Sequence, residues 1–292
     1  RDWPRPESTG RAPQEQAAPG RNLLAPRAGL PATGEPLAPE ALYDWATMTA
    51  ALAAETPWWT PGAEHGYAPI TYGWLIGEVI RRVDGREPGA AIVARSARPL
   101  GLDFHIGLDD AEFPRVAHIA RGKGNLGDAA AQRLLRTMMT DAAALSTRAF
   151  TNPPSVLTST NKPEWRRMSQ PAANGHGNAR SLAGFYSGLL QGRLLDDALL
   201  AELTREHAVG EDRTLLTCTR FGLGCMLDQP TVANATYGLG PQAFGHPGAG
   251  GSIGFADPER ELAFGFVVNT LGPYVLMDPR AQRLARLAGD CL

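Results

Sequence analysis

The sequence predicts an α+β protein in which helices come first and antiparallel strands come late. Amphipathic segments with helical spacing fill residues 39–210, whereas alternating segments of strand type lie between residues 219 and 269. A last amphipathic segment, residues 278–292, follows the strands and is expected to pack on them as a helix. Segregation of helices from strands is typical of α+β folds and unlike the alternation found in parallel α/β folds.

Four segments of the first two thirds carry helical patterns. Residues 39–55 begin with Pro39, which suits a first helical turn, and residues 71–85 end at Gly85, which suits a helix C-terminus. The other two amphipathic segments are residues 127–145 and 178–192. Together they predict a mainly helical region over residues 39–210.

The last third changes to a period of two. Residues 219–227, TRFGLGCML, alternate like one strand. Residues 251–269 are predicted to form a hairpin whose strands are joined by the turn DPER. We therefore expect sheet strands and the closing helix within residues 211–292, and a single domain over residues 1–292.

The first residues do not look like an independent unit. Residues 1–39 are rich in proline and glycine, which break helical and strand patterns alike, and only residues 22–30 look buried. A compact domain rarely opens with so long an irregular segment, and the chain starts with Arg1 rather than methionine. We expect the natural N-terminus to lie upstream.

Composition excludes several classes of function. The net charge of −2 gives no basic surface for nucleic acid, and the sequence has no apolar run of the roughly 20 residues that span a bilayer. No signal peptide is recognisable, so a cytoplasmic protein is expected. The three cysteines match neither a disulfide framework nor a zinc pattern, and no metal or organic cofactor is expected.

Ser252 stands in the pattern Gly250-Gly251-Ser252-Ile253-Gly254, which matches the G-x-S-x-G nucleophile elbow of α/β-hydrolases. That fold needs a helix after the serine and a histidine later in the chain. The residues after Ser252 have a strand pattern, and no histidine follows them. The motif therefore predicts a structural serine.

Ser159 and Lys162 form the only S-x-x-K match of the chain. The chemistry requires both side chains on one helix, where residues three apart meet. Pro163 disfavours helical backbone at Lys162 and suits the first residue of a helix that leaves Ser159 outside. Ser159 is therefore expected in a loop.

Several segments resemble, in order, the serine β-lactamase-like carboxylesterases, which are related to class C β-lactamases and penicillin-binding proteins. The resemblance begins near residue 23 and extends to the C-terminus. It is carried by residues 23–32, 59–86 (WTPGAEHGYAPITYGWLIGEVIRRVDGR), 99–108, 152–155, 171–186, 220–227 and 245–269 (GHPGAGGSIGFADPERELAFGFVVN). It implies a serine β-lactamase-like fold, with an antiparallel sheet flanked by helices plus a helical region. It also implies hydrolysis of a small-molecule ester or amide through an acyl-enzyme.

The same resemblance implies a substrate strand in the glycine-rich segment. His246, Pro247 and Gly248 take the place of the K-T-G or H-T-G triplet on a strand beside the active site. The N–H of Ala249 would donate to the oxyanion, and Gly250 would allow close approach of the backbone. A purely structural His246 is the alternative.

Two further residues follow from the resemblance. Tyr67, in HGYAP, matches the tyrosine of the Y-x-N-like motif, which implies a part in proton transfer. The loop of residues 174–180 would line the rim, which makes His176 a weaker candidate for substrate binding. The alternative for Tyr67 is a packed, hydrogen-bonded core tyrosine.

The sequence departs from the family pattern at the nucleophile. No S-x-x-K helix precedes residue 23, and Ala25, Pro26 and Ala28 replace a Ser-His pair and a second serine. Pro247 removes a hydroxyl and a backbone N–H from the triplet. Two hypotheses follow: part of an active serine hydrolase, or an inactive homologue that binds a ligand or acts as a scaffold.

Overall fold

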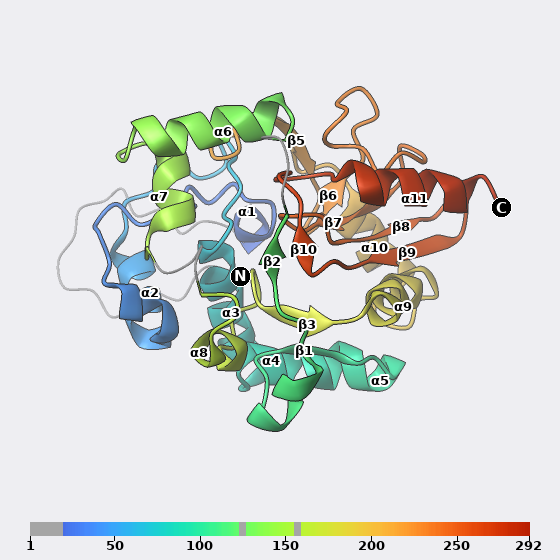
Figure 1. The fold of residues 1–292 in the computed structure, drawn as a ribbon, viewed down its shortest axis with the longest axis horizontal. Coiled ribbons are helices and arrows are strands. Elements are labelled where there is room, and N and C mark those ends of the chain that lie inside the picture. Colours follow the sequence, from blue (N-terminus) through green and yellow to red (C-terminus); the bar gives the residue numbers. More distant parts are fainter. Residues whose placement is uncertain (1–19, 123–126, 155–158) are drawn as a thin grey trace.

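The computed structural model describes residues 20–122, 127–154 and 159–292 (Figure 1). Its α-helices within these ranges are α1 (Gly20–Leu24), α2 (Trp45–Ala54), α3 (Thr71–Asp84), α4 (Pro88–Ile92), α5 (Arg98–Leu100), α6 (Ala129–Thr140), α7 (Leu145–Thr151), α8 (Pro163–Arg167), α9 (Ala179–Leu190), α10 (Asp197–Thr204) and α11 (Pro279–Gly289). Helical segments of other kinds are η1 (Pro39–Tyr43), η2 (Val93–Ala97) and η3 (Asp110–Arg115). The strands are β1 (Phe104–Ile106), β2 (Ala120–Arg121), β3 (Gly175–Gly177), β4 (Ala208–Glu211), β5 (Cys218–Phe221), β6 (Met226–Leu227), β7 (Phe244–Pro247), β8 (Ile253–Asp257), β9 (Leu262–Phe266) and β10 (Thr270–Leu271).

The predicted helices are present, with one interruption. α3 ends at Gly85, whose φ of 77° gives the left-handed C-terminal turn that glycine favours. The single helix predicted over residues 39–55 is wrong, because Asp44 adopts an extended conformation. Its carboxylate accepts from the N–H groups of Ala46 and Thr47, so it caps α2 and separates it from η1.

The main sheet is antiparallel, in the order β4-β5-β6-β7-β8-β9. The predicted hairpin is confirmed as β8 and β9, with Phe255 opposite Phe264. The single strand predicted over residues 219–227 is wrong, because the chain reverses between β5 and β6 at Gly224, whose φ is 81°. Two short pairs, β1-β3 and β2-β10, lie outside this sheet.

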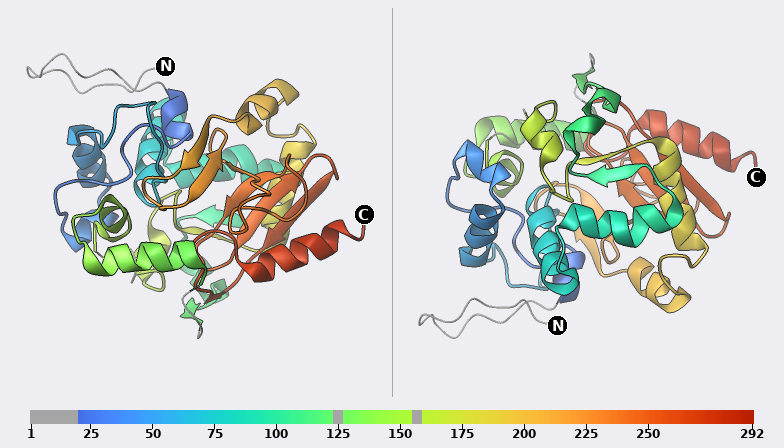
Figure 2. Two further views of the ribbon diagram at one scale, coloured as in Figure 1. Left: turned by 90° about the horizontal axis from the view of Figure 1, so that it is seen from above. Right: turned by 90° about the horizontal axis from the view of Figure 1, so that it is seen from below.

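Helices cover both faces of the main sheet, so the fold is α+β, as the sequence predicts. Successive residues of β8 point to opposite faces: Phe255 belongs to the apolar cluster that includes Ala281 and Ala285 of α11, whereas Ala256 belongs to the cluster that includes Tyr186 of α9. Figures 1 and 2 show α11 and α9 on opposite sides of β8 and β9.

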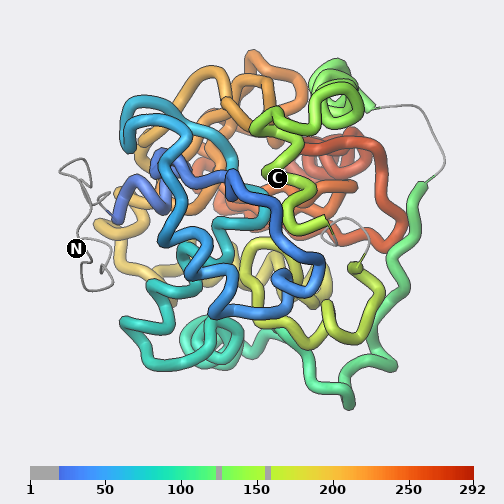
Figure 3. The backbone as a smooth tube through the Cα atoms, turned by 90° about the vertical axis from the view of Figure 1, so that its left-hand side faces the viewer, coloured from blue at the N-terminus to red at the C-terminus, as the bar shows by residue number. Residues whose placement is uncertain are grey.

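A second core lies in the helical region, which faces the viewer in Figure 3. α2 and α3 pack through buried apolar side chains, with Leu42 and Leu23 joining them from η1 and α1. Gly77 lets the two helices approach closely, since a Cβ there would lie 2.5 Å from the Trp45 ring. Within the described ranges, no helix combines the length and the apolar character needed to cross a membrane.

Candidate active site

Tyr67 lies where the helical region meets the main sheet. It belongs to the loop that precedes α3, and its ring stacks on His246 of β7 with the ring centroids 5.6 Å apart. The ring also lies parallel to Phe221 of β5, at 6.3 Å and an interplanar angle of 8°. The structure therefore brings together two of the predicted site residues, Tyr67 and His246, from distant parts of the chain.

The loop that carries Tyr67 is held by the segment between β4 and β5. The Tyr67 N–H donates to both carboxylate oxygens of Asp212, at 3.1 and 3.0 Å. The Arg213 N–H donates to the carbonyl of His65 at 3.2 Å. Gly66 leaves no room for a side chain, because a Cβ would lie 2.8 Å from the Thr214 hydroxyl. Tyr67 is thus fixed through its backbone.

Asp212 is a buried carboxylate with a full set of donors. Besides Tyr67, it accepts from the N–H groups of Thr214 and Leu215, both at 2.8 Å, and from the Thr219 hydroxyl at 3.1 Å. His65 Nε2 lies 2.9 Å from the same hydroxyl. The sequence reasoning missed these residues. The available signal was an aspartate two residues before Thr214 in a loop, a pattern that indicates a turn in which the carboxylate accepts from the backbone two residues on.

Tyr67 is a neutral phenol at neutral pH. Burial raises the pKa of Tyr67 well above its ordinary value of 10, and the nearby Asp212 carboxylate acts in the same direction. A phenol in this state donates a hydrogen bond or a proton, and a tyrosinate base would require a cation beside it. The arrangement suits a proton donor.

His246 presents a free lone pair. Its Nδ1 lies 2.7 Å from the Pro247 carbonyl, which can only accept, so Nδ1 carries the ring proton and Nε2 is unprotonated. Burial lowers the pKa of His246 below its ordinary 6.5, which keeps the ring neutral at pH 7. No described residue bonds Nε2, and a neutral imidazole with a free Nε2 is a proton acceptor.

The glycine-rich loop after β7 is fixed on both sides of Ala249. The Gly248 N–H donates to the Ser252 carbonyl at 2.6 Å, and the Gly250 N–H donates to the Tyr274 carbonyl at 3.0 Å. The described residues provide no hydrogen-bond acceptor for the N–H of Ala249, and Ala249 itself is exposed. A fixed, unpaired N–H is what an oxyanion donor requires.

Gly250 adopts a φ of 95°, in the range that residues with a side chain rarely adopt. A Cβ there would also lie 2.7 Å from the Leu271 side chain. The backbone groups that approach Gly250 are the Tyr274 carbonyl and the Gly272 N–H, which donates to the Gly250 carbonyl at 2.7 Å. Substrate binding at Gly248 and Gly250 stays a prediction.

His176 lies on β3, opposite His105 of β1. Burial lowers the pKa of His176, and its Nδ1 is buried without a hydrogen-bond partner among the described residues. Its described contacts do not include Tyr67 or His246. A role at the rim remains a prediction.

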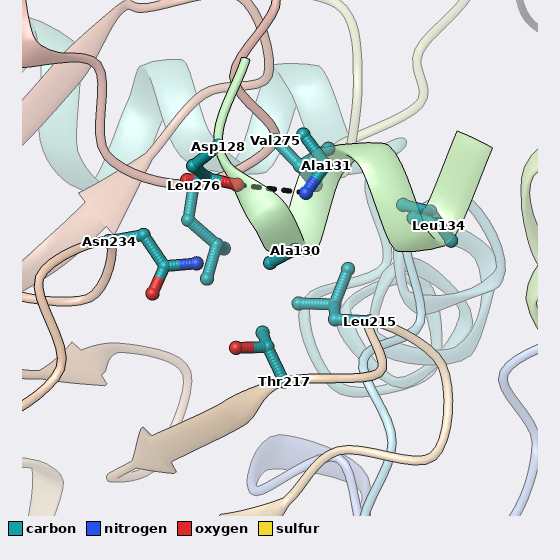
Figure 4. A pocket seen from close by; sticks show the side chains of 9 residues that line it. All are labelled: Asp128, Ala130, Ala131, Leu134, Leu215, Thr217, Asn234, Val275 and Leu276. Atoms are coloured by element: carbon teal, nitrogen blue, oxygen red, sulfur yellow. Dashed lines mark hydrogen bonds between the residues drawn. The ribbon is translucent and has the colours of Figure 1, made fainter. Parts of the chain in front are cut away.

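Two hollows in the described part of the chain are separate from the Tyr67–His246 pair. One lies between the start of α6 and Leu215 (Figure 4), and its volume of about 10 Å³ suits one water molecule at most. The other, of about 250 Å³, is polar and is bordered by Arg27, Glu64 and His65. Arg27 is already engaged there by the carbonyls of Gly62 and His207.

Most of the chain matches a known protein family. The family model described as Beta-lactamase matches residues 3–288. The chain belongs to the Beta-lactamase family. This assignment agrees with the resemblance inferred from the sequence and with the observed α+β fold.

Relatives within and around the Beta-lactamase family include esterases and penicillin-binding-protein homologues. The chain is 33% identical over 250 residues to "Esterase/beta-lactamase LipL" of Mycobacterium tuberculosis; the match covers 81% of this chain and 56% of LipL. A crystal structure of a penicillin-binding protein homologue from Caulobacter crescentus has a TM-score of 0.81 at 35% identity, covering 94% of this chain and 72% of that one. The structure of a family VIII carboxylesterase has a TM-score of 0.82 at 31% identity, covering 96% of this chain and 72% of that one. The chain thus spans little more than half of LipL.

Neither serine motif has, within the described part of this Beta-lactamase family chain, the helix geometry that its chemistry requires. Ser252 accepts a hydrogen bond from the Val268 N–H at 3.2 Å, and β8 rather than a helix follows it. Ser159 is buried, and its Oγ has no partner among the described residues. Lys162 is extended and precedes α8, so Ser159 lies outside that helix, as predicted.

Proposed function

We propose that this Beta-lactamase family protein hydrolyses a small-molecule carboxylic ester through an acyl-enzyme on a serine. The observation that carries the proposal is the stacked pair of Tyr67 and His246. His246 lies three residues before Ala249, whose N–H has no acceptor among the described residues. Two relatives more than 30% identical to this chain, the esterase/beta-lactamase LipL and the family VIII carboxylesterase, support an ester as the substrate class.

The three groups divide the acyl-transfer chemistry. A serine Oγ attacks the ester carbonyl carbon, and the N–H of Ala249 donates to the oxygen that becomes negative. His246 Nε2 accepts a proton as the serine adds, and the neutral Tyr67 phenol donates one to the departing alcohol. Water then attacks the carbonyl carbon of the acyl-enzyme and gives a proton to Tyr67, while His246 returns its proton to the serine oxygen. This step releases the carboxylic acid and restores the serine.

A second function, ligand binding without turnover, is favoured by one observation. Ser252 and Ser159, the two serines that stand in nucleophile motifs, have no described contact with a lysine or histidine side chain. A homologue that keeps the Tyr67–His246 site and lacks acyl-enzyme chemistry would bind an ester and leave it intact.

One experiment separates the two functions. The folded protein is incubated with a fluorophosphonate, its intact mass is measured, and the adduct is located by peptide mapping. Ester hydrolysis predicts a stoichiometric adduct on a serine other than Ser252 and Ser159. A folded sample with no adduct would mean that this chain carries no activated serine, which would refute hydrolysis by the chain alone and support the binding function.

A further inference from the structure

We propose that Asp212 is the positioning residue of Tyr67, and that Thr219 and His65 hold its carboxylate in place. The inference rests on the proposed role of Tyr67 and extends it to residues in another segment of the chain. Asp212 acts through the Tyr67 backbone N–H, which lies 3.0 and 3.1 Å from its two oxygens.

The bond to Tyr67 joins the helical region to the main sheet, beside the bond from the Arg213 N–H to the His65 carbonyl. Tyr67 begins the approach to α3 in the helical region, whereas Asp212 follows β4 in the main sheet. The Tyr67 ring rests on β5 and β7 through Phe221 and His246. Because the N–H is fixed to the sheet side by Asp212, the ring is held in register with His246.

The directions of the hydrogen bonds from His65 to Asp212 follow from the number of hydrogens that each group carries. The Thr219 hydroxyl has one hydrogen, which it donates to Asp212 Oδ2 at 3.1 Å. The hydroxyl must then accept from His65, so His65 carries its proton on Nε2. The resulting chain runs from His65 through Thr219 to Asp212. Asp212 and Thr219 are fully buried, and His65 is 6% exposed, so water does not replace these bonds.

The arrangement also explains why an uncharged substitute cannot serve. Every described partner of the Asp212 carboxylate is a donor: three backbone N–H groups and one hydroxyl. An asparagine would present its own NH₂ to one of them, which leaves a donor facing a donor in a buried site. In either orientation the amide keeps its oxygen near the Tyr67 N–H and turns its NH₂ toward the same group, so Asp212→Asn should weaken this bond while changing almost no volume.

A matched control exists elsewhere in the sheet region. Asp228 is also buried, and it accepts from the Tyr237 N–H at 2.6 Å and from the Thr236 hydroxyl at 2.9 Å. Tyr237 is a core residue with no described contact to Tyr67 or His246. Asp228→Asn reproduces the loss of a buried carboxylate without touching the proposed site.

The test uses the whole chain labelled with 3-fluorotyrosine and observed by ¹⁹F NMR, with the Tyr67 resonance assigned by Tyr67→Phe. D212N should shift the Tyr67 resonance by more than its line width, and D228N should leave it in place. A folded D212N protein with an unmoved Tyr67 resonance would overturn the proposal.

If D212N does not fold, Thr219 decides the question. Thr219→Val removes the hydroxyl at constant volume and should shift the same resonance, while Thr219→Ser keeps the hydroxyl and should leave the resonance at its wild-type position. An unmoved resonance in a folded Thr219→Val protein would overturn the proposal. This readout does not depend on turnover: loss of the Tyr67 role in catalysis would instead appear as unchanged ester hydrolysis in Tyr67→Phe.

Discussion

The ring of Tyr67 stacks on the imidazole of His246 at a centroid distance of 5.6 Å and an interplanar angle of 30°. The pair joins a loop of the helical region to the middle of the main sheet, where β7 lies between β6 and β8. One ring is a neutral phenol and the other a neutral imidazole whose Nε2 has no partner among the described residues, so the pair holds a donor beside an acceptor.

His246→Gln should abolish most ester hydrolysis while the protein stays folded. The variant removes the Nε2 lone pair, and loss of a general base costs about 10²–10⁴-fold in kcat. Stopped-flow or steady-state release of p-nitrophenol from a short-chain ester measures the effect. His118→Gln, at an exposed histidine, is the control and should retain the wild-type rate. Equal rates in the two variants would remove His246 from the mechanism.

Gly250→Ala should destabilise the loop beside Ala249 more than a comparable change elsewhere. Its φ of 95° is costly for alanine, about 1–2 kcal/mol, and the new Cβ would also meet the Leu271 side chain at 2.7 Å. Gly85→Ala is the control, because Gly85 has a φ of 77° and open space around a Cβ. Urea unfolding should show the larger loss for Gly250→Ala, and equal losses would refute the steric contribution.

Ser252→Ala should leave fluorophosphonate labelling and ester hydrolysis intact. Among the described residues, Ser252 Oγ bonds the Val268 N–H alone, so the variant loses that hydrogen bond, worth about 1 kcal/mol. Labelling stoichiometry and the midpoint of thermal unfolding measure the two effects. Loss of the adduct in a folded S252A protein would make Ser252 the nucleophile and overturn its structural assignment.

His176 should make the protein less stable in mild acid. Burial lowers the pKa of His176 in the folded state, so its contribution is complete above the unfolded value of 6.5 and is lost as the pH falls through the lower folded value. Asp212 and Asp228 act with the opposite sign, since burial raises the pKa of both carboxyls. The prediction is therefore a difference between variants.

The measurement is urea unfolding of wild type and His176→Gln between pH 7.5 and about pH 5, a range that begins above the unfolded histidine pKa. The stability of wild type should fall relative to the variant as the pH is lowered. His118→Gln should run parallel to wild type. A constant gap between wild type and His176→Gln would contradict a depressed pKa at His176.

Local signals in the sequence predicted much of the fold. The helix that ends at Gly85 and the hairpin of β8 and β9 depend on the spacing of apolar residues and on turn residues. Both signals lie within a short stretch of the sequence and can be found there. The break at Asp44 was missed because Pro39 and the apolar spacing run through it, and only the cap reveals the competing conformation. The reversal at Gly224 was missed because alternation continues across it.

The candidate site was less visible in the sequence. Tyr67, His246 and Ala249 were identified from a family resemblance, and no local pattern places them together. The bond between the Tyr67 N–H and Asp212 joins segments far apart in the chain, so it depends on the packing of the helical region against the sheet. Such contacts leave no periodicity to detect.

The most direct test of the central claim is the steady-state hydrolysis of a short-chain p-nitrophenyl ester by wild type and by Tyr67→Phe. The variant removes one hydroxyl and keeps the stacked ring, and Tyr43→Phe, at an exposed tyrosine, is the control. The account predicts that kcat falls about 10²–10⁴-fold in Tyr67→Phe, with unchanged thermal stability and a wild-type rate in the control. An unchanged kcat in Tyr67→Phe would contradict the assignment of this stacked pair as the centre of proton transfer.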